Sequence, residues 1–171
     1  MPGKKIIIDG YNLIKANPDI FSKMPDLESQ RHHLLKILQS APVLHGKEIL
    51  VVFDGTTGQN FPPAEKKGRI QLIFSGKTQE ADEVIQKLIR KNASSQMMQI
   101  ISSDRSIKNT AKDHRVSTMT SQEFWKSLLG NHIKTSRAVN EDSSSNRHLS
   151  DNEIQEWLKL FQNREESRHE D

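Results

Sequence analysis

Short, almost wholly apolar segments alternate with amphipathic helical patterns along this chain, and that alternation restricts its fold more than any other feature. Residues 4–9 and 48–54 are rich in β-branched side chains, and an aspartate closes each of them. Residues 69–74, 97–102 and 115–119 predict three further strands. Strands that are apolar on both faces are typical of a parallel sheet covered by helices on both sides. The sequence therefore predicts an α/β domain with a central parallel sheet.

Helical patterns fill the intervals between these strands. Residues 26–40 and 79–92 each place apolar side chains at helical spacing, and Asp26 can cap the first of these helices. Residues 106–113 predict a shorter helix. Thr120 opens a capping box (TSQE) ahead of a further apolar stripe, and this predicts another helix start.

The character of the sequence changes after residue 130. Residues 1–130 hold the strand and helix patterns, so we expect a single domain there. Residues 131–149 are polar, serine-rich and aperiodic, which predicts a flexible linker. Residues 150–165 follow a second capping box and carry an apolar helical stripe. Because an exposed stripe lowers solubility, we favour docking of this helix on the domain over binding of a separate partner.

Several function classes lack their sequence signatures. The 171 residues include no cysteine, which excludes disulfides and thiolate zinc sites, and the histidines show no HxH or HExxH spacing. The phosphate loops GxGxxG and GxxxxGKS/T are missing, as is the GxSxG elbow. The apolar run at residues 49–53 is too short to cross a membrane, and residues 1–10 lack a signal peptide's apolar stretch. We therefore expect a cytoplasmic protein without a membrane partner.

Four aspartates fall where a parallel sheet would gather them. Asp9, Asp54 and Asp104 follow predicted strands, and Asp82 lies in the first turn of the helix after the third strand. The carboxyl ends of parallel strands share one edge, where ligand sites form. Crowded carboxylates need a cation to stay ionised together, and oxygen ligands suit Mg²⁺ or Mn²⁺. Two such ions could promote hydrolysis of a phosphodiester, although the sequence leaves the number of ions open.

Each of these aspartates also has a purely structural interpretation. Asp9 and Asp54 each precede a glycine, as in common turns. Asp82 suits a helix N-terminus by its charge, and Asp104 suits an N-cap. A structural role is favoured for any one of them, whereas four on one edge favour a site.

The same residues carry a family resemblance. The matching segments are IIIDGYN at 6–12, VVFDG at 51–55, ADEVI at 81–85, SSDR at 102–105 and TSQEFWKSL at 120–128. In this order and spacing they resemble the YacP-like branch of the NYN domains, within the PIN-like nuclease superfamily, over about residues 4–130. The terminal EIQEWLKLF also resembles the C-terminal helix of that branch.

The resemblance implies a three-layer PIN-like fold and endoribonuclease activity with Mg²⁺ or Mn²⁺. It further implies RNA bound during or near translation, with messenger RNA favoured as substrate and the ribosome as a possible partner. Asp9, Asp82 and Asp104 fall on the family's metal-binding acids. Asn12 falls on the motif asparagine, which can orient a ligand water or phosphate, and Asp54 matches a more peripheral acid.

Two positions depart from the family pattern. Glu80 stands where relatives usually have threonine, two residues before the helix aspartate, and this carboxylate could ligate metal or face solvent. Asp113 and His114 stand where relatives often have glycine before the fifth strand, which affects a turn and leaves the chemistry untouched.

Basic residues near the predicted site could hold the RNA backbone, although solvated surface side chains are an equally good interpretation. Residues 55–67 predict a loop, and residues 1–130 carry a net charge of +6 against −3 for the rest, which favours a polyanion. The candidates are Lys66, Lys67, Arg69, Arg105 and Lys108. Tyr11 could stack on a base, but a packed role at a strand end is favoured.

Three hypotheses follow. The leading one is a metal-dependent endoribonuclease with Asp9, Asp82, Asp104 and Asn12 as catalytic residues and Asp54 as a supporting ligand. The second is an RNA- or ribosome-binding module of the same fold without catalysis, which four unneutralised carboxylates disfavour. The third is a phosphatase of the haloacid dehalogenase type with Asp9 as nucleophile; this class needs a second aspartate where the chain has Tyr11. The sequence does not fix the oligomeric state.

Overall fold

The computed structural model describes residues 3–55, 64–92 and 97–137. The chain divides into two compact units, Met1–Ser136 and Arg137–Asp171, and the fold below is that of the first unit, with α6 ending at Arg137. The helix expected at 150–165 lies outside the described residues, as does most of the expected linker.

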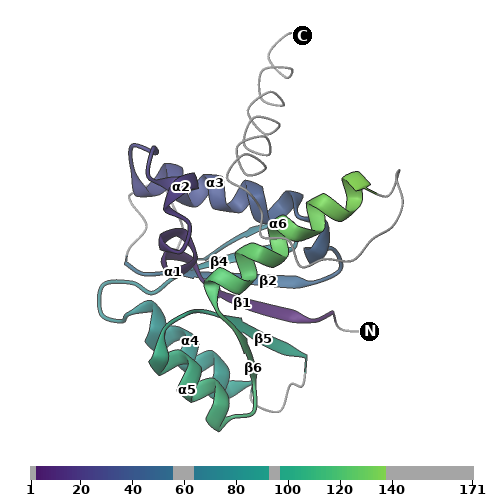
Figure 1. Ribbon diagram of the computed structural model, residues 1–171. Helices are drawn as coiled ribbons and strands as arrows, with labels where there is room; N and C mark the ends of the chain where they lie inside the picture. Colours follow the sequence, from purple (N-terminus) through teal and green to yellow (C-terminus); the bar gives the residue numbers. More distant parts are fainter. Residues whose placement is uncertain (1–2, 56–63, 93–96, 138–171) are drawn as a thin grey trace. The chain divides into compact units, whose positions relative to one another are not determined.

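Within the described residues, six strands form one sheet in the order β3-β4-β2-β1-β5-β6 (Figure 1). Strands β4, β2, β1, β5 and β6 run parallel, and β3 pairs antiparallel with β4 at one edge. The strands are β1 Lys5–Asp9, β2 Glu48–Phe53, β3 Ala64–Lys67, β4 Ile70–Phe74, β5 Met98–Ile101 and β6 Ser117–Met119. The prediction of an α/β fold with a central parallel sheet is confirmed.

Helices cover both faces of this sheet. Figure 1 shows α4 and α5 on one side and α1, α3 and α6 on the other, which gives the three layers of the expected fold. The helices are α1 Gly10–Lys15, α2 Pro18–Phe21, α3 Leu27–Ser40, α4 Ala81–Lys91, α5 Arg105–Asp113 and α6 Ser121–Arg137, with a 3₁₀ turn at Pro42–Leu44. In the described ranges no helix combines the length and the apolar character that crossing a bilayer requires.

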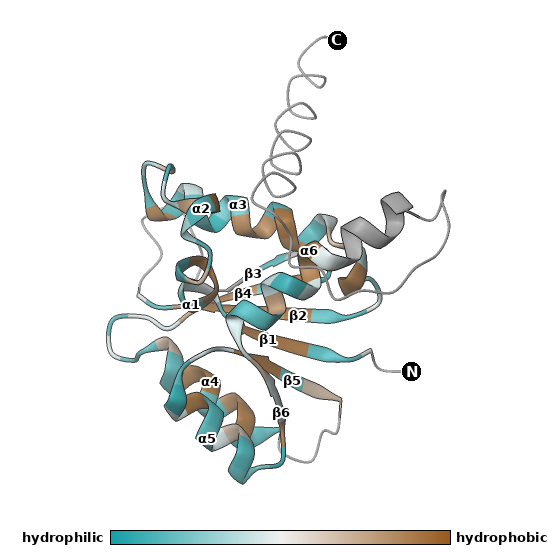
Figure 2. Cartoon of the chain, in the orientation of Figure 1, coloured by the Kyte–Doolittle hydropathy of each residue, from teal (hydrophilic) through white to brown (hydrophobic). Residues whose placement is uncertain are grey.

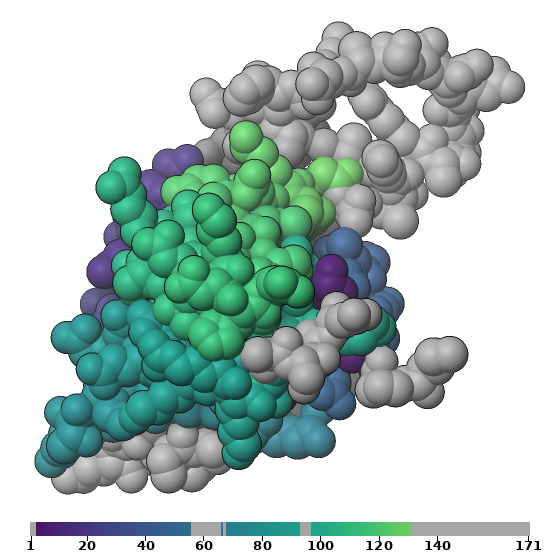
Figure 3. Space-filling view, turned by 90° about the horizontal axis from the view of Figure 1, so that it is seen from below, coloured from purple at the N-terminus to yellow at the C-terminus, as the bar shows by residue number. Residues whose placement is uncertain are grey.

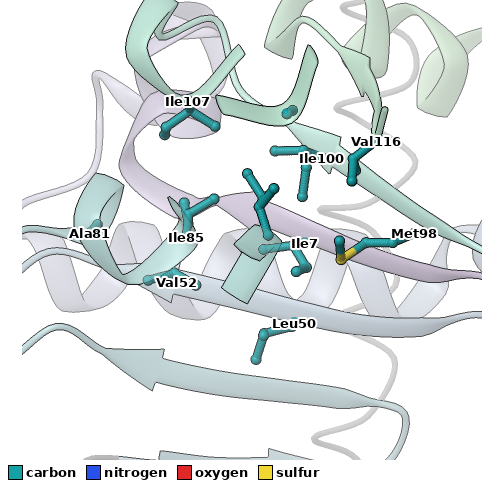
Figure 4. Packing of buried hydrophobic residues seen from close by; sticks show 11 residues of the cluster. Ile7, Leu50, Val52, Ala81, Ile85, Met98, Ile100, Ile107 and Val116 are labelled. Carbon is teal, nitrogen blue, oxygen red and sulfur yellow. The ribbon is translucent and has the colours of Figure 1, made fainter. Parts of the chain in front are cut away.

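The core beneath α4 and α5 explains why the strands lack a polar face. Ile7, Leu50 and Ile100 come from three neighbouring strands and belong to one buried cluster with Ile85 of α4 and Ile107 of α5 (Figure 4). Apolar residues colour the strands and the inner sides of the helices, while hydrophilic residues lie outside (Figure 2). Helices α4 and α5 also lie against each other in the view from below (Figure 3). Strands buried on both faces therefore read as continuous apolar runs.

The opposite face is closed by α1, α3 and α6. Trp125 of α6 is buried, and its indole Nε1 donates a hydrogen bond to the carbonyl oxygen of Leu13 in α1, at 2.8 Å. The Trp125 ring also packs on Phe21 of α2, with centroids 5.9 Å apart. These contacts fix the start of α6 beside α1, close to the end of β1.

The caps predicted for two helices are confirmed. Asp26 accepts a hydrogen bond from the backbone N of Ser29 at 2.7 Å and caps α3. The Thr120 backbone N donates to Glu123 Oε2 at 2.8 Å, and the Glu123 backbone N donates to Thr120 Oγ1 at 3.2 Å. This reciprocal capping box opens α6.

The structure differs from the sequence prediction at two boundaries. The segment expected to be a loop through residue 67 contains β3, because Gly68, with φ +61°, turns the chain back on itself into a hairpin with β4. Helix α6 continues to Arg137, beyond the expected linker start at 131, since no proline interrupts it.

Candidate active site

Three of the predicted acids meet at the carboxyl edge of the sheet. Asp9 is the last residue of β1, Asp82 is the second residue of α4, and Asp104 is the N-cap of α5 just beyond β5. The negative charges of Asp104 and Asp82 both raise the pKa of Asp9, so the three carboxylates are close enough to interact. They come from segments far apart in the chain, as the strand-end pattern predicted.

Asp9 is the most buried member of this set. It caps α1, and its Oδ1 accepts a hydrogen bond from the Asn12 backbone N at 3.4 Å, while Oδ2 accepts one from Ser102 Oγ at 3.3 Å. Burial raises the pKa of Asp9, and the two acidic neighbours raise it further, which outweighs the lowering by these hydrogen bonds. A negative charge held under these conditions favours the approach of a cation.

Asp104 caps the N-terminus of α5 and also lies at the carboxyl edge of the sheet. Its Oδ1 accepts hydrogen bonds from Ser106 Oγ at 2.6 Å, Ser106 N at 2.8 Å and Ile107 N at 3.1 Å. The Ser106 hydroxyl contributes most to lowering the pKa of Asp104, so this side chain stays ionised at neutral pH. All three bonds end on Oδ1, and Oδ2 takes no part in them. The N-cap interpretation is therefore correct, and it is compatible with ligand binding through Oδ2.

Asp82 and Glu80 lie at the start of α4. Asp82 is half-buried, and its Oδ1 accepts a hydrogen bond from the next backbone N, that of Glu83, at 2.7 Å. Glu80 occupies the N-cap position of α4 but makes no side-chain capping bond, and it is exposed. Its carboxylate thus takes no part in starting the helix.

The donor set fits a hard divalent cation. Among the described residues, no group of three or more acidic or histidine side chains is arranged to hold a metal ion by itself. Mg²⁺, however, commonly takes only one or two protein carboxylates and keeps several waters. Asp9 with one acidic neighbour supplies oxygen ligands of that kind. The residues present fit Mg²⁺ or Mn²⁺ better than a nitrogen- or sulfur-preferring metal.

Asn12 is held in one orientation beside Asp9. Its Oδ1 accepts hydrogen bonds from Ser103 N at 2.9 Å and from Ser121 Oγ at 2.6 Å. Because a backbone N can only donate, the amide oxygen must face Ser103. The Nδ2 group is therefore the part of Asn12 that can donate to a water or a phosphate.

The serines whose hydrogen bonds connect the residues at this edge of the sheet were not predicted from the sequence. Ser102 is 1% exposed, and its Oγ accepts a hydrogen bond from the Asp104 backbone N at 3.1 Å while donating to Asp9. Ser121 is fully buried, and its backbone N donates to Ser103 Oγ at 3.1 Å. These serines link the ends of β1 and β5 to the start of α6. For Ser102 and Ser103, the sequence signal was a pair of serines immediately between an apolar strand and an aspartate.

Asp54 makes different contacts from those of the three interacting acids. It follows β2, is exposed, and accepts a hydrogen bond from Ser75 Oγ at 2.9 Å. Its charge is not among those that shift the pKa of Asp9. The structure thus ties Asp54 to the segment after β4.

Two of the predicted RNA-binding residues lie at the other end of the sheet. Lys67 pairs with Ile70 at the amino end of β4, about 13 Å along the strand from Phe74 at its carboxyl end. The Arg69 guanidinium donates to main-chain oxygens at the end of α3, including that of Gln39 at 2.9 Å. The hairpin turn carries both residues away from the acids, contrary to the expected place beside the site. Lys66, one position along β3, is exposed.

The remaining two basic candidates stay near the acids. Arg105 is the first residue of α5 and is exposed, and Lys108 lies one turn later. The pKa of Glu123 is lowered mainly by its hydrogen bonds to Thr120, and the charge of Lys108 adds to this effect. Lys108 therefore lies between the starts of α5 and α6.

Comparison with known proteins identifies a family model and solved relatives. The model described as "YacP-like NYN domain" matches residues 6–163. The "uncharacterized protein YacP" of Bacillus subtilis (strain 168) is 30% identical over 84 residues, a match that covers 48% of this chain and about half, 49%, of the relative. The crystal structure of Rae1 (YacP) from Bacillus subtilis is similar with a TM-score of 0.61, at 23% identity over 78% of each chain. A tryptophan-to-leucine mutant of that protein gives a TM-score of 0.60 at 23% identity over 80% of each chain. At this identity the two structures show a shared fold.

Proposed function

The chain belongs to the YacP-like NYN domain family, and from this premise we propose that it is a metal-dependent endoribonuclease. The NYN domains lie within the PIN-like nuclease superfamily, so a nuclease-like function related to RNA is the coarse assignment. The finer proposal is hydrolysis of RNA phosphodiester bonds in the cytoplasm, with messenger RNA at the ribosome as substrate. The finer proposal draws its support from the carboxyl-edge acids and from the family resemblance.

The observation that carries the proposal is the electrostatic state of Asp9. A half-buried carboxylate under the repulsion of Asp82 and Asp104 is unfavourable in the free protein. A neutral asparagine could also cap α1 and accept the hydrogen bond that Asp9 accepts from the Asn12 backbone N. The charged arrangement becomes favourable once a divalent cation offsets the charges, which explains why the three acids are kept together.

The residues of the edge would then take distinct roles. Mg²⁺ or Mn²⁺, when bound, would supply an activated water and neutralise charge on the phosphate. Asp9 and one of its two acidic neighbours, Asp82 or Asp104, would hold it through their oxygens. Ser102 fixes the rotamer of Asp9, and Asn12 presents Nδ2 for a hydrogen bond to the phosphate or to a water.

A cleavage assay tests this proposal. End-labelled structured and unstructured RNAs are incubated with Mn²⁺ or with chelator. We expect cleavage by the wild type only with metal, and a loss of at least about 1,000-fold in Asp9→Asn, in the range of losses from removing a main catalytic group. The matched control is Asp54→Asn, which removes an exposed carboxylate from the same edge that is hydrogen-bonded to Ser75. We expect a loss of under about tenfold for this control, corresponding to less than about 1.4 kcal/mol.

One observation favours a second candidate, an RNA-binding module without catalysis. Within the described part of the chain, no three acids are already grouped as metal ligands. Metal-independent RNA binding with no products in Mn²⁺, equal in wild type and Asp9→Asn, would support this candidate and exclude the nuclease.

A further inference from the structure

A cluster of aromatic rings holds an arginine next to the acidic edge. The Arg31 guanidinium lies over the Phe74 ring, with Cζ 5.3 Å from the ring centroid, and its Nη1 donates to the Tyr11 hydroxyl at 3.1 Å. Phe53 stacks on Phe74 with centroids 5.7 Å apart, and Tyr11 meets Phe53 edge-on at 5.1 Å. Arg31 is thus in contact with two members of a packed aromatic group.

The position of this cluster follows from the elements that carry it. Phe53 and Phe74 are the last residues of β2 and β4, and Tyr11 is the second residue of α1, two positions after Asp9. Helices α1 and α3 lie on the same side of the sheet (Figure 1). Arg31, in the second turn of α3, therefore reaches the carboxyl edge of the sheet.

The physical chemistry of this arginine suits phosphate recognition. A guanidinium offers five N–H donors in a planar fork that matches phosphate oxygens. Packing on Phe74 and the bond to Tyr11 fix the side chain before a ligand arrives, so less entropy is lost on binding. Arg31 is half-buried, and its charge also contributes, after the hydrogen bonds of Ser29, to the lowered pKa of Asp26.

We propose that Arg31 binds an RNA phosphate next to the one that is cut, and that Tyr11 positions its guanidinium. This inference rests on the proposed nuclease function. Arg31 lies over Phe74 at the end of β4, whereas the three acids lie at the ends of β1 and β5 and at the start of α4, so it is placed for a neighbouring phosphate of the strand and not for the scissile one. It gives the polyanion a cationic contact at an edge where the acids alone would repel it.

Binding measurements give the first test. The affinity for a single-stranded RNA oligonucleotide is measured in the Asp9→Asn background across a range of salt concentrations. We expect Arg31→Gln to weaken binding about tenfold and to reduce the salt slope by about 0.7, the value for one phosphate contact on a single strand. The control is Lys112→Gln, which removes the same charge from an exposed residue at the far end of α5. We expect it to change affinity less than about twofold, a surface-charge effect.

Neutral linkages in the substrate provide the second test. Oligonucleotides carry a single methylphosphonate at successive positions beside the cleavage site. With active protein, we expect Arg31→Gln to raise KM about tenfold with little change in kcat, as for loss of uniform binding. The methylphosphonate at the contacted position should impair the wild type and leave Arg31→Gln unaffected. Tyr11→Phe, which keeps the ring and removes the hydroxyl, should give an intermediate increase in KM.

The outcomes of these tests distinguish the proposed role of Arg31 from the proposed nuclease function. A wild type that cuts no RNA overturns the proposed function. A wild type that cuts RNA, with unchanged KM in Arg31→Gln and equal methylphosphonate effects in both proteins, overturns the role of Arg31 alone. A lowered unfolding temperature with unchanged affinity below it would also overturn that role, because it would show a structural tie only.

Discussion

Arg115 shows how a single residue can be strained by its place in the chain. It has φ +57° and directly follows His114, the C-cap residue of α5. Its backbone N donates to the Lys112 oxygen at 3.0 Å, and the next backbone N, that of Val116, donates to the Ala111 oxygen at 2.8 Å. This pair of bonds is a Schellman motif, which places its left-handed residue where glycine is favoured. Arg115, and not Asp113 or His114, is therefore the residue of this turn at which glycine is favoured.

We therefore expect Arg115→Gly to stabilise the protein. The left-handed conformation costs a non-glycine residue about 1–2 kcal/mol, and the greater freedom of glycine in the unfolded chain offsets part of that gain. The net increase in the free energy of unfolding should be about 0.5–1 kcal/mol, measured by urea denaturation. Arg115→Ala removes the same charge while keeping the unfavourable conformation, so it should show no gain. Equal gains in both variants would attribute the effect to charge.

At the scale of elements, α1 depends on one close approach. A Cβ built on Gly10 would lie 2.3 Å from Cε1 of the Phe53 ring, and Phe53 is fully buried. Gly10 therefore lets the first turn of α1 pack on the end of β2, which places Asp9 and Asn12 at the edge. The neighbour that would have to move is a core ring.

We expect Gly10→Ala to destabilise the fold by about 1–3 kcal/mol, the usual cost of overpacking. Gly130→Ala is the matched control, because a Cβ at Gly130 in α6 meets nothing within 4 Å. That variant should gain up to about 1 kcal/mol from its better helix propensity. Thermal unfolding of both variants measures the difference, and a neutral Gly10→Ala would show that the Phe53 ring can move aside.

The capping box of helix α6 makes a contribution to stability that depends on pH. Hydrogen bonds from Thr120 are the main cause of the lowered pKa of Glu123, whose ordinary value is 4.5. A lowered carboxyl pKa means that the unfolded chain takes up a proton first as pH falls. The stability from the Glu123 charge is therefore complete above about pH 4.5 and lost as pH falls through the lowered pKa.

Glu123→Gln should consequently be less stable than the wild type at pH 7 and equal to it in strong acid. Glutamine keeps the length and an acceptor oxygen, so the variant isolates the charge. Urea unfolding of both proteins from pH 7 to 2 measures this, at low salt. A difference that stays constant over that range would rule out the charge as its source.

The elements that the sequence predicted are those with a periodic pattern. The two central strands, β1 and β2, could be predicted from their continuous apolar runs, and α3 and α4 from apolar side chains at helical spacing. The short elements α1, α2 and β3 have four to six residues and no such pattern. They form because tertiary contacts hold them, as with Phe53 over Gly10, and no local signal reports those contacts.

On the scale of the whole molecule, strand topology accounts for what could be predicted of the site. Asp9 and Asp104 could be brought together from sequence because parallel strands end at one edge. The bond between Ser121 and Asn12 joins residues 109 positions apart, and no pattern in either segment announces it. Arg69 was misplaced for the same reason, because its distance from the acids depends on a hairpin turn. Sequence periodicity predicts which face of an element is buried and at which edge of the sheet a strand ends. It does not predict side-chain contacts between distant segments, which only the structure shows.

The proposed metal binding would be a property of the whole domain, because the acids come from three segments. Asp9, Asp82 and Asp104 come from β1, α4 and the end of β5, so a bound cation links elements that must all be folded. A ligand that binds only the folded state stabilises it by RT ln(1 + [L]/Kd), about 2.7 kcal/mol at a hundredfold excess over Kd.

We expect Mn²⁺ to raise the unfolding temperature of the wild type by several degrees, reversibly with chelator. Asp54→Asn should keep this increase and Asp9→Asn should lose it. In chelator, Asp9→Asn should be at least as stable as the wild type, because it no longer carries the half-buried charge that its neighbours repel. An equal Mn²⁺ effect on the wild type and Asp9→Asn would place the cation elsewhere and remove the electrostatic reason for gathering these acids.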